Sequence, residues 1–169
     1  MTTIDMSPSP NALLHCWRIF EADPLRPMLL ADTTTFVSAQ HFLNAVGNSI
    51  VPFLARVGGN PAAIAWLYDI AMVPPKMTPV SAFVAVYVLL DYRTCHLIRQ
   101  CAEAFLTQVR DYGVKHLWAE ARCDNLQSRY ALRACGFEKI VMLPSWKRYA
   151  GVWQNMELYH LPLGPRGDQ

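Results

Sequence analysis

Apolar residues change their spacing along the chain, and the changes mark successive strands and helices. Apolar residues recur at every second position over Val51–Val57, and a glycine-rich turn separates them from a second apolar run over Ala62–Met72, so the sequence predicts a β-hairpin. Apolar residues occupy both faces of Val80–Leu90, which is typical of a central strand covered on each side. Helical spacing over Leu97–Val109 then predicts an amphipathic helix that lies on the sheet.

A second set of patterned segments follows this helix. Residues 116–121 alternate again, and the intervening helix requires a right-handed crossover, so the two strands that it connects should be parallel. Asp124 predicts the start of a helix over Asn125–Cys135, and Phe137–Leu143 and Val152–Leu161 predict a closing pair of strands. The pattern therefore predicts an α/β (α+β) fold with a mixed central sheet.

The two ends of the chain carry weaker patterns. Residues 1–11 are rich in proline, serine and threonine, and they predict a mobile N-terminal arm or a strand that orders on a partner. Residues 12–162 should form a single domain, and residues 163–169 a flexible C-terminal tail. Within the domain, Leu13–Phe20 fits either a strand or a short helix, and Phe36–Val46 predicts a helix.

Composition narrows the class of protein. The 169 residues are 53% hydrophobic, which suffices for one core, and the formal net charge of +2 gives no strong nucleic-acid signal. The longest apolar stretch is too short to span a bilayer, and the five cysteines form no Cys-x-x-Cys pair. We therefore expect no membrane segment, no metal site, and buried thiols in a reducing, cytoplasmic compartment.

The predicted helix at Asn125 carries a specific motif. The run Asn125–Phe137, NLQSRYALRACGF, resembles the asparagine-to-glycine-phenylalanine helix of the GNAT acyltransferases, and the resemblance covers roughly Phe36–Leu161. It implies that Trp66–Ile70 is the third strand of that fold. More narrowly, the chain resembles acetyltransferase-like proteins of tailed bacteriophages, which implies virion proteins as partners and the virion as an alternative location.

The coenzyme loop departs from the family pattern. A diphosphate binds bare backbone N–H groups at a helix start, and close approach to them requires glycine. The family has Arg or Gln, two residues, Gly, one residue, then Gly or Ala, whereas this chain keeps Arg93 and has His96 and Ile98 at the glycine positions. The substitutions predict that no cofactor binds tightly, and acetyl-CoA is the cofactor if the chain is active.

The resemblance would assign coenzyme contacts to Leu89, Leu90, Arg93, Thr94, Cys95, His96 and Asn125. Two alternatives remain for the basic residues of this segment. Either they bind an anion through their side chains, or they form an ordinary helix start with a basic first turn.

The catalytic positions also depart from the family. The general acid is usually a tyrosine four residues before the glycine-phenylalanine pair, and that position here is Leu132. Tyr130 is a candidate substitute, but two residues turn a helix by about 200°, so it should point to a different face. Asp69 is the candidate general base, and its alternative role is capping or pairing with a surface cation.

An aromatic and basic loop is predicted over Ser145–Gly151, where the family places its substrate-side hairpin. It contains Trp146, Lys147, Arg148 and Tyr149, and Trp, Tyr and Arg dominate binding hot spots. The loop therefore contacts a protein partner or a substrate, or else it is a solvated loop with one core tryptophan.

Two functions follow from these patterns. In the first, the chain is a GNAT-fold protein that has lost acyl transfer and acts as an interaction or structural component, for example of a bacteriophage particle. In the second, it is an acetyl-CoA-dependent N-acetyltransferase that acts on an unknown amine. The substituted coenzyme loop favours the first.

Overall fold

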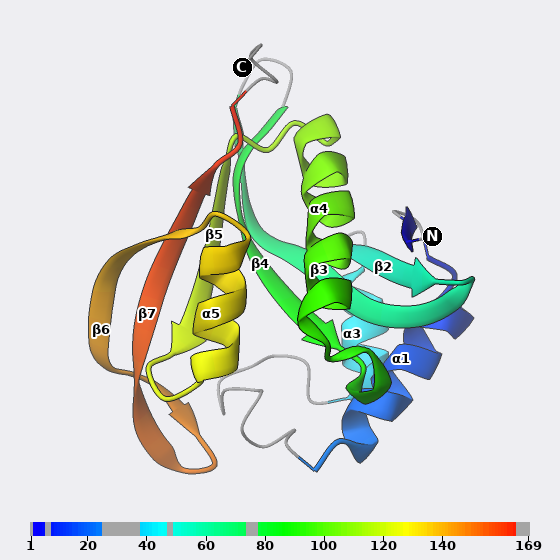
Figure 1. Ribbon diagram of the computed structural model, residues 1–169, viewed down its shortest axis with the longest axis horizontal. Coiled ribbons are helices and arrows are strands. Elements are labelled where there is room, and N and C mark those ends of the chain that lie inside the picture. The colour runs from blue at the N-terminus through cyan, green and yellow to red at the C-terminus, as the bar shows by residue number, and fades with distance from the viewer. Residues whose placement is uncertain (1, 6–7, 25–37, 47–48, 74–77, 165–169) are drawn as a thin grey trace.

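The computed structural model describes residues 2–5, 8–24, 38–46, 49–73 and 78–164. One seven-stranded sheet has the order β1-β2-β3-β4-β5-β7-β6 (Figure 1). Its strands are β1 Thr2–Asp5, β2 Val51–Val57, β3 Asn60–Val73, β4 Thr78–Val88, β5 His116–Arg122, β6 Glu138–Tyr149 and β7 Val152–Pro162. The helices are α1 Pro10–Ala22, α3 Ala39–Ala45, α4 Cys95–Asp111 and α5 Leu126–Ala134, with a 3-10 turn η1 at Leu90–Tyr92. The predicted mixed α/β fold is confirmed.

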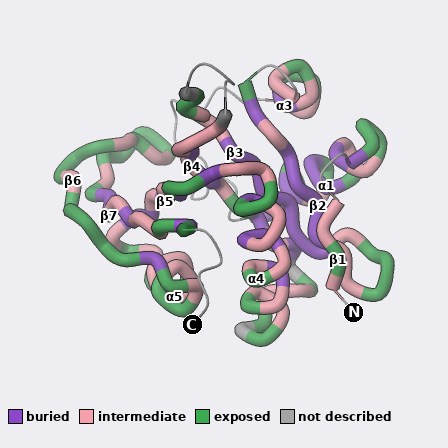
Figure 2. The backbone as a smooth tube through the Cα atoms, turned by 90° about the horizontal axis from the view of Figure 1, so that it is seen from above, coloured by how far each residue is buried: buried purple, intermediate pink, exposed green. Residues whose placement is uncertain are grey.

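Helices cover both faces of this sheet. α4 and α5 lie on one face, over a core that includes Leu67, Leu117 and Tyr159. α1 and α3 lie on the other face and contribute Trp17 and Phe42 to a second core (Figure 2). The sheet is therefore the middle of three layers, as expected for strands that are apolar on both faces.

The N-terminal residues join the sheet. β1 pairs antiparallel with β2, from Thr2 opposite Val57 to Asp5 opposite Leu54, where the sequence predicted an arm over residues 1–11. Pro10 begins α1, whose N-cap Ser9 accepts a hydrogen bond from the Ala12 N–H. Composition could not indicate this strand, because its hydrogen-bond partners lie on a strand far along the chain.

Helix α1 resolves the alternative that the sequence left open for Leu13–Phe20. Leu13, Cys16, Trp17 and Phe20 are all buried, and this spacing places them on one helical face. The segment is therefore a helix. Residues 36 and 37 of the predicted helix at Phe36–Val46 lie outside the described residues, and α3 occupies Ala39–Ala45.

The start of α5 differs from the prediction. Asn125, not Asp124, is the N-cap, and its side-chain oxygen accepts a hydrogen bond from the Ser128 N–H at 3.0 Å. Asp124 instead forms an ion pair with Arg122 at the end of β5. Two acceptors of the same capping type stand side by side in the sequence, and the ion pair decides between them.

The final hairpin is longer than predicted. β6 continues past Leu143 to Tyr149, so most of the predicted loop Ser145–Gly151 is strand, and the turn lies at Ala150-Gly151. The pairing of β6 with β7 is irregular between Leu143 and Lys147, which interrupts the alternation that marks a strand in the sequence. At the other end of the hairpin, Leu163 is buried, and residues 165–169 of the predicted tail lie outside the described residues.

Candidate functional site

The sheet divides between β4 and β5. Their parallel pairing covers only Ser81–Phe83 with His116–Trp118, although β4 continues to Val88 and β5 to Arg122. Beyond these three pairs, β4 stays paired with β3, and β5 stays paired with β7. The half of the sheet that contains β3 and β4 therefore diverges from the half that contains β5 and β7. We call this unpaired part, Val84–Val88 with Ala119–Arg122, the split.

Part of the split is uncovered on the face of the sheet that carries α4 and α5. Val86 lies on β4 within the split, where β3 pairs with β4 but β5 does not, and its side chain is 56% exposed. Val84, two residues earlier on the same face of the strand, is buried. An exposed apolar side chain at this depth therefore marks a place where an extended, partly apolar ligand would fit.

Helix α4 begins just beyond the end of β4. Leu89 is buried in the α1/α3 core, Leu90 opens the 3-10 turn, and Cys95 is the first helical residue. Thr94 is the N-cap, and its hydroxyl accepts a hydrogen bond from the Leu97 N–H at 3.4 Å. His96 is exposed, and its Nε2 lies 3.0 Å from the side-chain nitrogen of Gln100.

Arg93 points away from the helix start. Its Nη2 lies 2.5 Å from the Oδ2 of Asp23, and its Nε donates to the carbonyl of Val88 at 2.9 Å. The Tyr87 hydroxyl donates to the same Asp23 oxygen at 3.0 Å. The guanidinium therefore ties the end of α1 to the turn before α4, and its role is to hold that turn in place.

The first turn of α4 fits the diphosphate of an acyl-CoA, although less closely than a glycine loop would. The first backbone N–H groups of a helix have no intrahelical acceptor, and the positive end of the helix dipole lies there, although the Thr94 hydroxyl takes the N–H of Leu97. The contact between His96 and Gln100 places the imidazole along the flank of the helix. The Ile98 side chain still occupies space that a glycine would leave empty, so we expect weak binding.

Glu120 is the carboxylate that the structure places at the split. It lies on β5 two residues after Trp118, on the same face of the strand, and its side chain is 12% exposed. The Trp146 indole N–H donates to Oε1 at 3.0 Å, and the Lys147 ammonium forms an ion pair with Oε2. Sequence reasoning missed Glu120, although a carboxylate between apolar residues of a strand was a signal that could have indicated it.

Two tyrosines lie near Glu120. Burial raises the pKa of Tyr149 to about 12, and the nearby negative charge of Glu120 adds to this. The guanidinium of Arg122 opposes the shift and lies 5.2 Å from the centre of the Tyr149 ring. Burial, again with Glu120, raises the pKa of Tyr68 further above its usual value. Both hydroxyls are therefore protonated at neutral pH and are able to donate hydrogen bonds.

The candidate catalytic residues from the sequence lie elsewhere. Tyr130 is 73% exposed on α5, whereas Leu132 packs against the core beneath α4 and α5. Asp69 is exposed at an irregularity of β3, with a φ of 48°. Catalytic roles for Tyr130 and Asp69 stay predictions. Of the predicted aromatic and basic residues, Trp146 and Lys147 meet at Glu120 and Tyr149 lies close by.

A buried carboxylate on the face of the sheet that carries α4 and α5 positions α5. Glu157 is 3% exposed and accepts hydrogen bonds from Arg129 Nε at 2.8 Å, from Lys139 Nζ at 3.2 Å and from the Tyr159 hydroxyl. Burial by itself would raise the pKa of Glu157, but these donors outweigh it and hold the pKa below its usual range. The network joins α5 to the β6–β7 hairpin.

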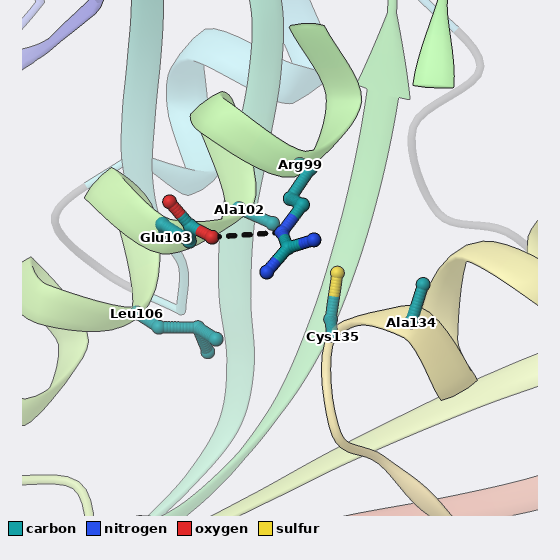
Figure 3. A pocket seen from close by; sticks show the side chains of 6 residues that line it. All are labelled: Arg99, Ala102, Glu103, Leu106, Ala134 and Cys135. Atoms are coloured by element: carbon teal, nitrogen blue, oxygen red, sulfur yellow. Dashed lines mark hydrogen bonds and ion pairs between the residues drawn. The ribbon is translucent and has the colours of Figure 1, made fainter. Parts of the chain in front are cut away.

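A cavity of about 160 Å³ lies between α4 and α5. Figure 3 shows the Arg99 guanidinium and the Cys135 sulfur pointing into it, with Arg99 also paired to Glu103. Burial and the charge of Glu103 raise the pKa of the Cys135 thiol, and Arg99 opposes them. The thiol is therefore protonated at neutral pH, which disfavours a role as nucleophile.

Within the described ranges, no three His, Cys, Asp or Glu side chains are grouped so that they could hold a metal ion. Over the same ranges, no helix is long and apolar enough to cross a membrane.

The model of the acetyltransferase (GNAT) family matches residues 15–137. No curated protein sequence is significantly similar to this chain. Among solved structures, yncA from Salmonella typhimurium, with its cofactor acetyl-CoA, matches with a TM-score of 0.75 at 16% identity, covering 99% of this chain and 96% of its own.

Two further solved structures have the same fold. The ribosomal-protein-S18-alanine N-acetyltransferase from Escherichia coli matches with a TM-score of 0.69 at 19% identity, covering 99% of this chain and 97% of its own. The ribosomal-protein-alanine N-acetyltransferase from Brucella melitensis matches with a TM-score of 0.74 at 18% identity, covering 94% of this chain and 98% of its own.

Proposed function

The chain belongs to the acetyltransferase (GNAT) family, and we propose that it transfers the acetyl group of acetyl-CoA to a primary amine. The observation that supports this proposal is the split between β4 and β5, with the first turn of α4 at its end and the carboxylate of Glu120 beside it. The helix start would hold the diphosphate, and the exposed Val86 side chain would contact the apolar part of the coenzyme.

When bound, acetyl-CoA supplies an activated thioester. Glu120 would accept the proton that the attacking amine loses, because it is the half-buried carboxylate at the split and already contacts a primary ammonium, that of Lys147. Leu132 has no proton to offer to the departing thiolate. A general acid contributes about 10² to 10⁴ in rate, so we expect a slow enzyme.

The test compares Glu120→Gln with Glu21→Gln, an exposed control on α1. Thiol release from acetyl-CoA is followed with a lysine peptide, an alanine-ended peptide and a polyamine as acceptors. Glutamine keeps the shape of the side chain and its hydrogen bond from Trp146 but is not a base, so kcat/KM should fall by about 10² or more. A Glu120→Gln rate equal to that of the control would refute the assignment of Glu120.

Coenzyme binding is measured separately. A ligand at about 100 times its Kd adds about 2.7 kcal/mol of stability, so acetyl-CoA should raise the Tm of the wild-type chain. No shift at millimolar acetyl-CoA or CoA would contradict the proposed activity as a whole.

The substituted loop supports a second candidate function, a GNAT-fold interaction protein without acyl transfer. His96 and Ile98 at the glycine positions motivate it, and the exposed side chains of Trp146, Val152 and Trp153 on the last hairpin would make the contacts. A role in a bacteriophage particle remains a prediction from sequence resemblance. The absence of any coenzyme-induced Tm shift would favour this candidate.

A further inference from the structure

The Glu120 carboxylate already has a primary amine bound to it. The Lys147 ammonium forms an ion pair with Oε2, and the adjacent Trp146 fixes Oε1 through its indole N–H at 3.0 Å. The Lys147 side chain is 30% exposed, so solvent and ligands reach it. An amine acceptor must reach the group that takes its proton, and Lys147 is within contact distance of that group.

We propose that Lys147 is an internal acceptor, so that the chain acetylates its own Lys147; this inference rests on the proposed function. The Lys147 ammonium gives one proton to the Glu120 carboxylate, and the lone pair that this frees on Nζ forms a bond to the acetyl carbon. The carbon–sulfur bond breaks as the acylated nitrogen loses its second proton to solvent. The electron pair of that bond leaves with the CoA sulfur, which takes a proton from solvent, and Glu120 releases its own proton to solvent. The products are one acetyl-lysine and one CoA thiol.

Acetylation would also open the site. The modified side chain is neutral, so the ion pair that holds Glu120 is lost. Glu120 then becomes available to an external amine. We therefore expect Lys147 to compete with external acceptors before modification and no longer to compete afterwards.

Lys139 provides a matched comparison on the same strand. It also forms an ion pair with a carboxylate, Glu157 at 3.2 Å, and its side chain is 43% exposed. Glu157, however, is opposite Ala121 and forms an ion pair with Arg129 of α5, which places it on the face of the sheet that carries α4 and α5. Glu120 is one residue along β5 from Ala121, so its side chain stands on the other face. If exposure alone decided which lysine is acetylated, Lys139 would carry the acetyl group, whereas the inference requires that Lys147 carries it.

The experiment incubates the purified full-length chain with isotopically labelled acetyl-CoA and locates the label by peptide mass spectrometry. The variants are Lys147→Arg, Lys139→Arg and Glu120→Gln. Arginine keeps a cation on Glu120 but is not acetylated. We expect label on Lys147 that is absent from Lys147→Arg, unchanged in Lys139→Arg, and slower by about 10² in Glu120→Gln.

Label that appears equally on Lys139 and Lys147, or that is unaffected by Glu120→Gln, would show uncatalysed acetylation and overturn the inference. If acetyl-CoA raises the Tm and an external amine is acetylated while Lys147 stays unlabelled, the inference is wrong and the proposed function stands. If acetyl-CoA gives no Tm shift and no amine is acetylated, both are wrong.

Discussion

Asp23 should be worth far more to stability than an ordinary polar residue at a helix end. It caps α1, is 3% exposed, and accepts hydrogen bonds from Arg93 at 2.5 Å and from the Tyr87 hydroxyl at 3.0 Å. Replacing it by alanine leaves a guanidinium that is 21% exposed without this carboxylate. Breaking a buried ion pair by removing one partner costs about 3–5 kcal/mol, and the partial exposure of Arg93 favours the lower end.

The measurement is thermal and urea unfolding of Asp23→Ala beside Asp91→Ala, an exposed control on the 3-10 turn. For a chain of this size, a loss of about 3 kcal/mol lowers the Tm by about 6–12 °C, whereas the control should stay within about 0.5 kcal/mol. Tyr87→Phe removes one hydrogen bond and should cost about 1 kcal/mol. If Asp23→Ala is no less stable than the control, the network does not hold the turn before α4.

Three further changes test the site and the packing around it. Replacing His96 and Ile98 by glycine should tighten acetyl-CoA binding, measured by calorimetry, by about tenfold, although each glycine destabilises the helix by about 1 kcal/mol. An unchanged affinity would show that these side chains do not obstruct the coenzyme. Leu132→Tyr should raise kcat by about 10², whereas Tyr130→Phe should leave it unchanged, and a folded Leu132→Tyr without a rate gain would exclude an acid at this position. Because burial would raise the pKa of Glu157 but its donors lower it, its stabilisation is complete above pH of about 4.5 and is lost as pH falls through the lower folded value. Unfolding free energy measured from pH of about 2 to 6 should therefore vary less in Glu157→Gln, and an equal pH dependence would contradict this.

Much of the fold could be predicted from the sequence, because local patterns carry it. The apolar stretch before α4, the helical spacing within it and the glycine-phenylalanine motif after α5 each depend on neighbours within a few residues. The exceptions were elements whose hydrogen bonds come from distant strands. Thr2–Asp5 is a strand only because β2 pairs with it, and β6 reaches Tyr149 only because β7 pairs with it across an irregular segment.

The candidate site was harder to predict, because it depends on which side chains face one another. The sequence marked Arg93 as the residue of the family loop that this chain keeps, but only the structure showed that Asp23 holds it. Glu120 was passed over as one polar position of an alternating strand. Its importance comes from the split beside it and from Trp146 and Lys147, which the last hairpin brings to its two oxygens.

The sequence by itself determined the family, the order of most of the helices and strands, and the presence of His96 and Ile98 in the first turn of α4, since each of these is encoded in short runs of residues. Only the tertiary structure decided that β4 and β5 part after three pairs, that one carboxylate stands at the place where they part, and that a lysine from another strand contacts it. Such contacts join residues far apart in the chain. No local pattern of hydrophobicity specifies them, because they arise from how β5, β7 and β6 pack together.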